Sequence, residues 1–104
     1  MTHPALDISE RAFQSLVEQA ARATGWYAFH PYDSRRSEPG YPDLTLVNPG
    51  KGRVVWAELK TSKGRLSPAQ KDWIWALEQA GQEVYVLRPA DWPLIERILT
   101  GARP

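Results

Sequence analysis

Apolar residues in the first quarter of the chain recur with the spacing of an amphipathic helix. After Ser9, which can cap a helix, they return every three or four positions. Gly25 follows the last of them and is a typical stop signal. We therefore predict a helix between these two residues. Its buried face should carry Phe13, Leu16, Val17, Ala20 and Ala21.

Three short β-rich runs follow this helix. Residues 26–30 form an aromatic run, and residues 43–48 and 53–60 are rich in branched and aromatic side chains. Residues 49–52 are Pro-Gly-Lys-Gly, a four-residue connection that suits a hairpin. The polar stretch 32–42 contains Gly and Pro, so we expect a mobile surface loop there.

A second helix is predicted by the start signal in residues 67–70. Ser67 can act as the N-cap, Pro68 suits the first helical position, and Gln70 completes a capping box. This helix should run to about Gly81. Its face formed by Trp73, Ala76, Leu77 and Ala80 is expected to pack on the sheet.

The last part of the chain predicts a strand and a helix. Residues 83–87 form the strand, Pro89 ends it, and Asp91 can cap a helix that closes at Gly101. The predicted order is α-β-β-β-α-β-α. We expect one α/β domain over residues 1–104, with a mixed central sheet and a C-terminal helix.

Composition agrees with one folded domain and excludes several classes of protein. The chain has 104 residues, 42% hydrophobic and 24% charged, and no cysteine. Disulfides and thiolate zinc sites are therefore excluded. No stretch reaches the roughly 18 apolar residues that a membrane span needs, and the start lacks an apolar signal core. We expect an intracellular, cytoplasmic protein without a membrane partner.

The predicted hairpin brings three charged residues together. If Asn48 pairs with Arg53, Asp43 lies directly opposite Glu58, and Lys60 follows on the same face. A register shift of one residue would move Asp43 to the other face. That other face looks like core, because it carries Leu44, Leu46, Val55, Ala57 and Leu59.

Two opposed carboxylates predict a cation between them, or a proton on one of them. Oxygen ligands without cysteine or a nearby histidine favour Mg²⁺ or Mn²⁺, which often binds substrate phosphate as well. A phosphodiester is then a plausible substrate. Lys60 could orient or deprotonate the attacking water, or neutralise charge on the phosphate.

A simpler interpretation of this pattern also exists. A Glu and a Lys two residues apart on a strand most often form a surface pair. The Pro42-Asp43 start of the preceding strand and the surrounding apolar residues favour a site. The sequence lacks P-loop spacing and a Gly-x-Ser-x-Gly elbow, so a nucleotide hydrolase and a serine esterase fit poorly.

These residues resemble the motifs of a known nuclease superfamily. Gly40-Tyr41-Pro42-Asp43, Glu58-Leu59-Lys60 and Leu66-Ser67-Pro68-Ala69-Gln70 are similar to those of the PD-(D/E)XK nucleases, specifically the VRR-NUC (virus-type replication-repair nuclease) branch. The resemblance implies a restriction-endonuclease-like αβββαβ core and metal-dependent cleavage of DNA, including branched, flap or Holliday-junction DNA. It implies that Asp43, Glu58 and the Leu59 carbonyl hold the metal, with Lys60 as the catalytic lysine.

Two further residues match the family's pattern, but each match also has a structural explanation. Glu10 would be the acidic residue that the family places on the first helix near the metal. A glutamate in a first turn also interacts favourably with the helix dipole. Gln70 would be the family's glutamine close to the lysine, and it also completes the capping box. We expect both roles for Gln70.

Basic residues flank the proposed site and are candidates for DNA contacts. Between residues 35 and 65 there are seven basic residues against three acidic ones. We expect phosphate contacts from both flanks, although each residue alone could be a solvated surface side chain. His30 has no second histidine nearby, so we expect a structural role. The proposed DNA-binding residues are Ser34, Arg35, Arg36, Lys63 and Arg65.

The second helix also suggests a protein partner. Trp75 lies about 200° around the helix from Trp73, so it should project outward. Single exposed aromatic residues are common, but a homodimer anchored near Trp75 would supply two sites for symmetric cuts. The alternative to an enzyme is a non-catalytic nucleic-acid-binding module, or a subunit of a repair or phage assembly.

Overall fold

One four-stranded sheet forms the centre of the domain. The computed structural model describes residues 3–31 and 38–103. The strands lie in the order β1-β2-β3-β4; β1 with β2 and β2 with β3 are antiparallel, whereas β3 and β4 are parallel. The predicted mixed sheet is therefore confirmed. The strands are β1 (Tyr27–Phe29), β2 (Leu44–Asn48), β3 (Arg53–Leu59) and β4 (Glu83–Leu87).

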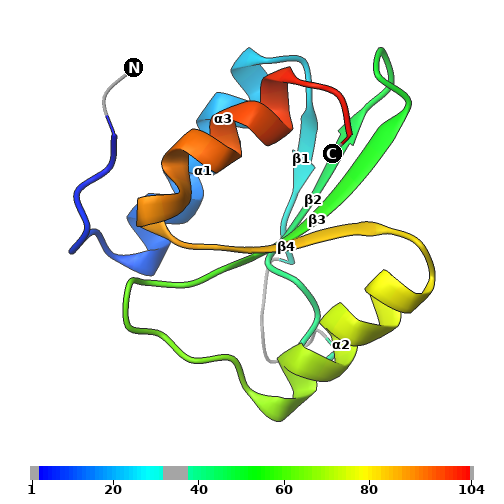
Figure 1. Cartoon of the computed structure of the whole chain (residues 1–104). Coiled ribbons are helices and arrows are strands. Elements are labelled where there is room, and N and C mark those ends of the chain that lie inside the picture. The colour runs from blue at the N-terminus through cyan, green and yellow to red at the C-terminus, as the bar shows by residue number, and fades with distance from the viewer. Residues whose placement is uncertain (1–2, 32–37, 104) are drawn as a thin grey trace.

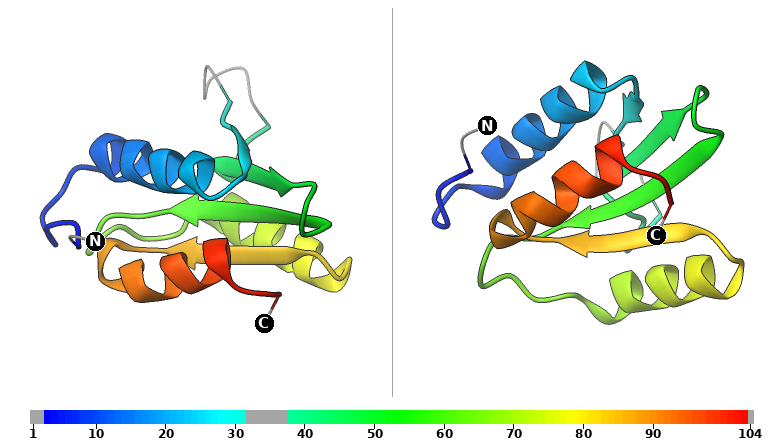
Figure 2. Two further views of the ribbon diagram at one scale, coloured as in Figure 1. Left: turned by 90° about the horizontal axis from the view of Figure 1, so that it is seen from above. Right: turned by 45° about the horizontal axis from the view of Figure 1, so that its top comes forward.

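Helices cover both faces of the sheet, as Figures 1 and 2 show. Two helices lie side by side on one face, and the remaining one lies on the opposite face next to β4. Among residues 3–31 and 38–103, no helix is both long and apolar enough to cross a membrane. The helices are α1 (Glu10–Ala23), α2 (Pro68–Gln79) and α3 (Trp92–Thr100), with the 3₁₀ turn η1 (Pro89–Asp91) before α3.

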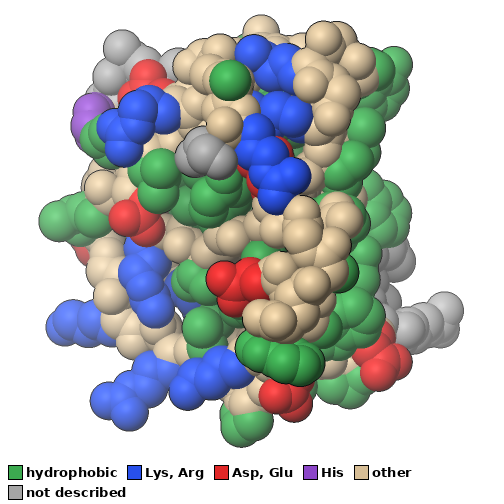
Figure 3. Space-filling view, turned by 45° about the vertical axis from the view of Figure 1, so that its right-hand side comes forward, with side chains coloured by type: hydrophobic (Ala, Val, Ile, Leu, Met, Phe, Trp, Pro, Cys, Tyr) green, Lys and Arg blue, Asp and Glu red, His purple; other side chains and the backbone are tan. Residues whose placement is uncertain are grey.

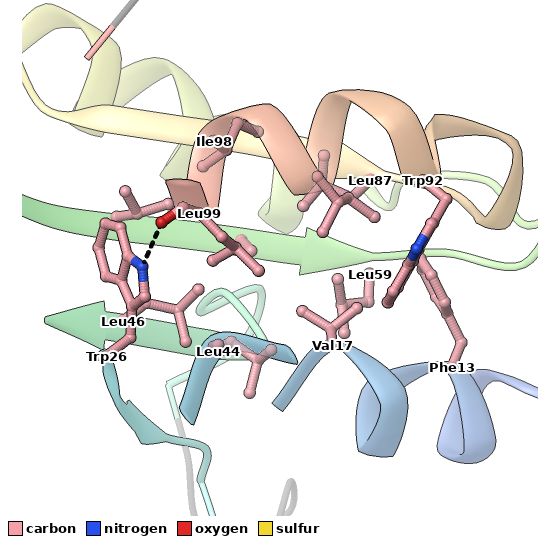
Figure 4. Packing of buried hydrophobic residues seen from close by; sticks show 14 residues of the cluster. Phe13, Val17, Trp26, Leu44, Leu46, Leu59, Leu87, Trp92, Ile98 and Leu99 are labelled. Carbon is pink, nitrogen blue, oxygen red and sulfur yellow. Dashed lines mark hydrogen bonds between the residues drawn. The ribbon is translucent and has the colours of Figure 1, made fainter. Parts of the chain in front are cut away.

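The main core lies between the sheet and the pair α1 and α3 (Figure 4). The sheet face predicted to be apolar is fully buried there, from Leu44 to Leu59. On α1, Phe13, Val17 and Ala21 are buried, whereas Leu16 and Ala20 pack at the margin of the core. The hydrophobic pattern therefore identified the correct face of each strand and of α1.

The helices α1, α2 and α3 all start at the predicted cap residues, and the side chain of the cap residue bonds the helix at two of them. The Ser9 hydroxyl accepts a hydrogen bond from the Ala12 amide at 3.1 Å. Ser67 and Gln70 form the predicted capping box, with bonds of 2.8 and 3.1 Å. Asp91 is the N-cap residue of the last helix, as predicted, but its side chain makes no capping hydrogen bond to that helix. Its carboxylate instead accepts from the Arg88 amide at 2.8 Å, because η1 separates β4 from α3.

The predicted buried face of α2 needs a correction. Trp73 and Leu77 are half-buried, but Ala76 and Ala80 are exposed, and no residue of this helix is fully buried. The reason is that α2 lies over β4 near the edge of the sheet. Among the described residues, the α2 side of β1 and β2 is therefore largely uncovered.

Candidate active site

The β2–β3 hairpin has the predicted register. Asn48 pairs with Arg53, and Leu44 pairs with Ala57 at the other end of the ladder. Extending this register by one residue sets Asp43 opposite Glu58, although β2 itself begins one residue after Asp43. Both residues therefore lie on the α2 side of the sheet, opposite the core face.

Asp43 is fixed by the backbone of the neighbouring strand. Its Oδ2 atom accepts a hydrogen bond from the Leu59 amide at 2.8 Å. The ladder with β2 stops at Ala57, so the carboxylate supplies an acceptor beyond its end. This bond holds the Asp43 side chain against the segment that carries Glu58 and Lys60.

The carboxylate of Glu58 is unusual in being buried without a hydrogen-bond partner among the described residues. The residue is only 1% exposed, yet neither carboxylate oxygen has a hydrogen-bond partner among the described residues. A buried charge without a partner is strongly unfavourable, so such groups bind a cation or keep a proton. Glu58 therefore requires a bound cation or a proton to be stable in this position.

Burial is also the main influence on the acidity of Glu58. Burial and then the adjacent Asp43 carboxyl raise the pKa of Glu58 to about 8. The nearby Lys60 ammonium opposes this rise, and the Glu10 charge adds a small contribution to it. Asp43 and Lys60 are thus both close enough to Glu58 to influence its charge.

The side chains alone do not form a three-carboxylate metal site. Within the described ranges, no group of three or more His, Cys, Asp or Glu side chains is arranged to hold a metal ion. A cation at Asp43 and Glu58 would need backbone, water or substrate oxygens as further ligands, which is the usual pattern for Mg²⁺. The unsatisfied oxygens of Glu58 and the hard donor set fit such an ion.

The segment before Asp43 is docked on the start of α2, a feature that the sequence analysis missed. Gly40 has a φ of +80°, and a Cβ atom there would lie 2.3 Å from the backbone carbon of Ala69. Only glycine permits this approach. Tyr41 packs edge-on against Trp73, with ring centroids 5.0 Å apart. These contacts place Asp43 beside α2.

A small cavity lies next to Asp43. It has a volume of about 190 Å³, and Gln14, His30 and Gln70 are among the side chains that line it. Gln70 can therefore cap α2 and face this cavity at once. Gln14 was not predicted; it lies one helical turn after Glu10, which is the signal that could have revealed it. His30 is exposed, and its Nδ1 lies 3.2 Å from the Pro31 carbonyl oxygen.

The predicted basic flanks are only partly described. Lys63 and Arg65 are exposed in the segment between β3 and α2, and Lys63 lines a hollow of about 560 Å³ beside the N-terminal segment. Figure 3 shows basic side chains gathered at the lower left of one face of the molecule. Ser34, Arg35 and Arg36 lie outside the described residues.

Sequence comparison identifies the family of this domain. The family model described as the VRR-NUC domain matches residues 2–91 of the chain. The chain belongs to the VRR-NUC family. A relative of this VRR-NUC domain is the Fanconi-associated nuclease 1 homolog of Schizosaccharomyces pombe, 43% identical over 54 residues. That match covers 52% of the chain but only 8% of the relative, so the chain spans a small part of that protein's length.

Solved structures share the fold of this VRR-NUC domain. A structure titled VRR_NUC domain has a TM-score of 0.69 at 21% identity, covering 86% of this chain and 91% of the other. A VRR_NUC domain protein has a TM-score of 0.67 at 20% identity, covering 91% and 92%. Hjc, a Holliday junction resolvase from Archaeoglobus fulgidus, has a TM-score of 0.56 at 22% identity, covering 74% and 64%. These likenesses confirm the predicted nuclease-like fold.

Proposed function

We propose that this VRR-NUC domain is a metal-dependent nuclease that hydrolyses phosphodiester bonds of DNA. The observation that carries the proposal is the buried Glu58 carboxylate, unpartnered among the described residues and next to Asp43. In a purely structural role, Glu58 would have to keep a proton beside the Asp43 carboxylate to be stable in this position. A divalent cation would offset the repulsion between the two carboxylates, which would both serve as its ligands.

The residues of the hairpin have distinct roles in this proposal. Asp43 and Glu58, with the Leu59 carbonyl, would hold Mg²⁺ or Mn²⁺, and the bound ion would polarise the scissile phosphate. The Leu59 amide engages one Asp43 oxygen and leaves the other available. Glu58 must lose its proton to take part, because only the carboxylate is a good ligand.

Lys60 supplies a positive charge close to Glu58. Its ammonium lowers the pKa of Glu58, so it lies near the reaction centre. There it would orient or help to deprotonate the attacking water, or neutralise charge that develops on the phosphate. Gln70 and Glu10 are assigned supporting roles: Gln70 beside the cavity next to Asp43, and Glu10 near Glu58.

Branched DNA is the substrate class that we favour. One named relative is a nuclease homolog and one structural relative is a Holliday junction resolvase. Lys63 and Arg65, with Ser34, Arg35 and Arg36, would bind phosphates on either side of the scissile bond. The competing function is a nucleic-acid-binding module without catalysis, which would not require both carboxylates to be ionisable.

A second copy of the chain is the protein partner in this proposal. Tyr27, Phe29, Val47 and Val54 are exposed on the sheet face that α2 leaves uncovered, and their register places them together. Trp75 is 64% exposed on α2. A clustered apolar surface of this kind favours a protein interface. A homodimer would give a branched substrate two sites related by a twofold axis.

A cleavage assay tests the proposed activity directly. The purified protein is incubated with single-stranded, duplex, flap and four-way DNA, in Mg²⁺, in Mn²⁺ and in EDTA. We expect cleavage of at least one substrate that depends on the metal and is lost in Asp43→Asn. Binding of DNA by wild type without any cleavage would favour the non-catalytic module instead.

A further inference from the structure

An arginine beyond β4 holds the turn that directly follows Lys60. The Nη1 atom of Arg88 donates hydrogen bonds to the carbonyl oxygens of Thr61 and Gly64, each at 2.7 Å. The Gly64 amide also donates to the Thr61 carbonyl at 3.2 Å, which closes the turn. One guanidinium nitrogen therefore bridges both ends of turn 61–64.

Arg88 is itself restrained by a hydrogen bond at its backbone and by partial burial. Its backbone amide donates to the Asp91 carboxylate at 2.8 Å, and its side chain is half-buried. Asp91 ends η1, directly before α3. A planar guanidinium in such surroundings loses little further freedom when it forms its bonds. The turn is thus tied to the rigid junction between β4 and α3.

Lys60 is closely coupled to this turn. Its backbone amide donates to the Leu87 carbonyl at 3.0 Å, one residue before Arg88. A Cβ atom placed on Gly64 would lie 3.0 Å from Thr61 Oγ1 and 3.3 Å from Lys60 Cδ, so the stem of the lysine lies close to the turn. The position of turn 61–64 therefore limits the directions in which the Lys60 ammonium can point.

We propose that Arg88 is a positioning residue that orients Lys60 by clamping turn 61–64. The proposal rests on the proposed nuclease function, in which Lys60 acts at the reaction centre. The bonds of Arg88 go to backbone carbonyls of its own chain. Its loss should therefore lower kcat and leave KM for DNA nearly unchanged. A displacement of about 1 Å at a reacting group can cost on the order of 100-fold in rate.

The kinetic test compares Arg88→Ala, Arg88→Lys and the exposed control Arg97→Ala on α3, well below their melting temperatures. We expect kcat to fall roughly 10- to 100-fold in Arg88→Ala, with KM changed less than about twofold. Arg88→Lys keeps the charge but reaches less far, so its kcat should also fall. The opposite pattern, a raised KM in Arg88→Ala that Arg88→Lys restores, would mean that Arg88 binds DNA phosphates and would overturn the proposal.

Two further measurements separate positioning from a general loss of stability. Guanidinium ions, at concentrations far below those that unfold the protein, should restore part of the kcat of Arg88→Ala. Hydrogen exchange at the Gly64 amide should quicken in Arg88→Ala while β2 and β3 stay protected. If Arg88→Ala does not fold, Gly64→Ala, which crowds Thr61 Oγ1 within the turn and then Lys60 Cδ, should lower kcat with Arg88 intact.

The outcomes distinguish this proposal from the proposed function. A wild type that cleaves no DNA would refute the nuclease and, with it, any catalytic meaning of the clamp. A wild type that cleaves DNA, with Arg88→Ala at the same kcat, would overturn the positioning role alone. Unchanged exchange at Gly64 in Arg88→Ala would show that the arginine does not hold the turn.

Discussion

Asp43 and Leu59 are joined by a hydrogen bond from the Leu59 amide to the Asp43 carboxylate, at 2.8 Å. The bond crosses from the segment before β2 to the residue between Glu58 and Lys60. It therefore locks the predicted reaction centre to a single register, because a shift of one residue would remove both the bond and the shared face. The same carboxylate raises the pKa of Glu58, so Asp43 has a structural and an electrostatic effect.

The first prediction is that Asp43→Asn folds but loses cleavage. Asparagine retains an oxygen that can accept from the Leu59 amide, and it removes the repulsion with Glu58. Without the negative ligand, metal-dependent cleavage should fall by more than about 100-fold. The melting temperature in EDTA should equal or exceed that of wild type. Undiminished cleavage by purified Asp43→Asn would refute the proposed site.

The matched variant Asp43→Ala isolates the hydrogen bond. It removes the same negative charge but also the acceptor, and so leaves the Leu59 amide without its present partner. Relative to Asp43→Asn, its free energy of unfolding should be lower by about 1–3 kcal/mol, the usual cost of an unsatisfied buried group. Urea denaturation of the two variants gives this difference. Equal stabilities would show that the bond contributes nothing measurable.

The second prediction concerns the pH dependence of stability. The pKa of Glu58 is about 8 in the folded protein, against an ordinary value of 4.5. The folded state therefore binds more protons than the unfolded state between these pH values. Wild type should lose stability relative to Glu58→Gln as pH rises from about 4.5 to about 8, by at most about 1.4 kcal/mol per pH unit. Parallel stability profiles for the two proteins would contradict a raised pKa.

The effect of Mg²⁺ should show the opposite trend with pH. The cation binds the ionised form of Glu58. As pH approaches 8, a smaller fraction of Glu58 carries a proton that the cation must displace. The rise in melting temperature produced by Mg²⁺ should therefore increase from about pH 5 to about pH 8. Glu58→Gln should show little rise at any pH. A large rise in that variant would place the metal elsewhere.

The sequence was sufficient, for physical reasons, to predict the hairpin and the position of Asp43 opposite Glu58. The four-residue connection after Asn48 leaves little freedom of register, and the core face of β2 and β3 is uniformly apolar. Together these features determine on which side Asp43 and Glu58 lie. Turn length and the alternation of apolar residues can be recognised from residues only a few positions apart in the chain.

The long-range contacts around the site could not be predicted from the sequence in the same way. Arg88 holds turn 61–64, and Gly40 packs on Ala69, across distances along the chain that no periodicity records. The exposure of Ala76 on α2 was missed because it depends on where the helix lies over the sheet. Tertiary placement decides such features, whereas local pattern decides only which face of an element is apolar.

The third prediction concerns DNA affinity. Lys63 and Arg65 are exposed in the segment that follows Lys60, and both are proposed to contact phosphates. The double variant Lys63→Ala with Arg65→Ala should bind DNA more weakly and reduce the slope of log affinity against log salt by about 2. The exposed Arg97 on α3 provides a control, because Arg97→Ala should leave the slope unchanged. An unaltered slope in the double variant would exclude both phosphate contacts.

The fourth prediction concerns a buried ion pair that supports the hairpin. Arg53 binds both Glu83 oxygens at 2.7 and 2.9 Å and donates to the carbonyls of Ile98 and Gly101. Next to it, the Trp26 indole donates to the Leu99 carbonyl at 2.9 Å (Figure 4). These bonds satisfy the end of α3, and the hydrogen bond from Arg53 helps to lower the pKa of Glu83 against the effect of burial.

Arg53→Ala should therefore be strongly destabilising. It leaves the Glu83 carboxylate buried without its main partner, which typically costs about 3–5 kcal/mol. Lys51→Ala is the matched control, because the Lys51 side chain donates an exposed hydrogen bond, at 3.2 Å, to the Thr100 carbonyl and forms no buried ion pair with any described residue. That variant should change the free energy of unfolding by about 0.5 kcal/mol or less. Urea denaturation should separate the two, and similar values would contradict a supporting role for the ion pair.

The fifth prediction concerns the uncovered face of the sheet. Tyr27 is 73% and Phe29 62% exposed, and Val47 lies beside Tyr27 in the ladder. If a second copy covers this face, Val47→Lys would bury a charge at the interface and should give a monomer. Leu6→Ala is the control, because Leu6 is 62% exposed but lies in the N-terminal segment. It should remain dimeric.

Light scattering over a range of concentrations decides among these outcomes. A dimeric wild type, a dimeric Leu6→Ala and a monomeric Val47→Lys would place the interface on the open sheet face. If Trp75→Ala also dissociates, the interface extends over α2, whereas a dimeric Trp75→Ala excludes only that residue as an anchor. A wild type that stays monomeric at every concentration would reject the dimer. The two cuts in a branched substrate would then have to be made by separate binding events, which predicts nicked intermediates that accumulate at low protein concentration.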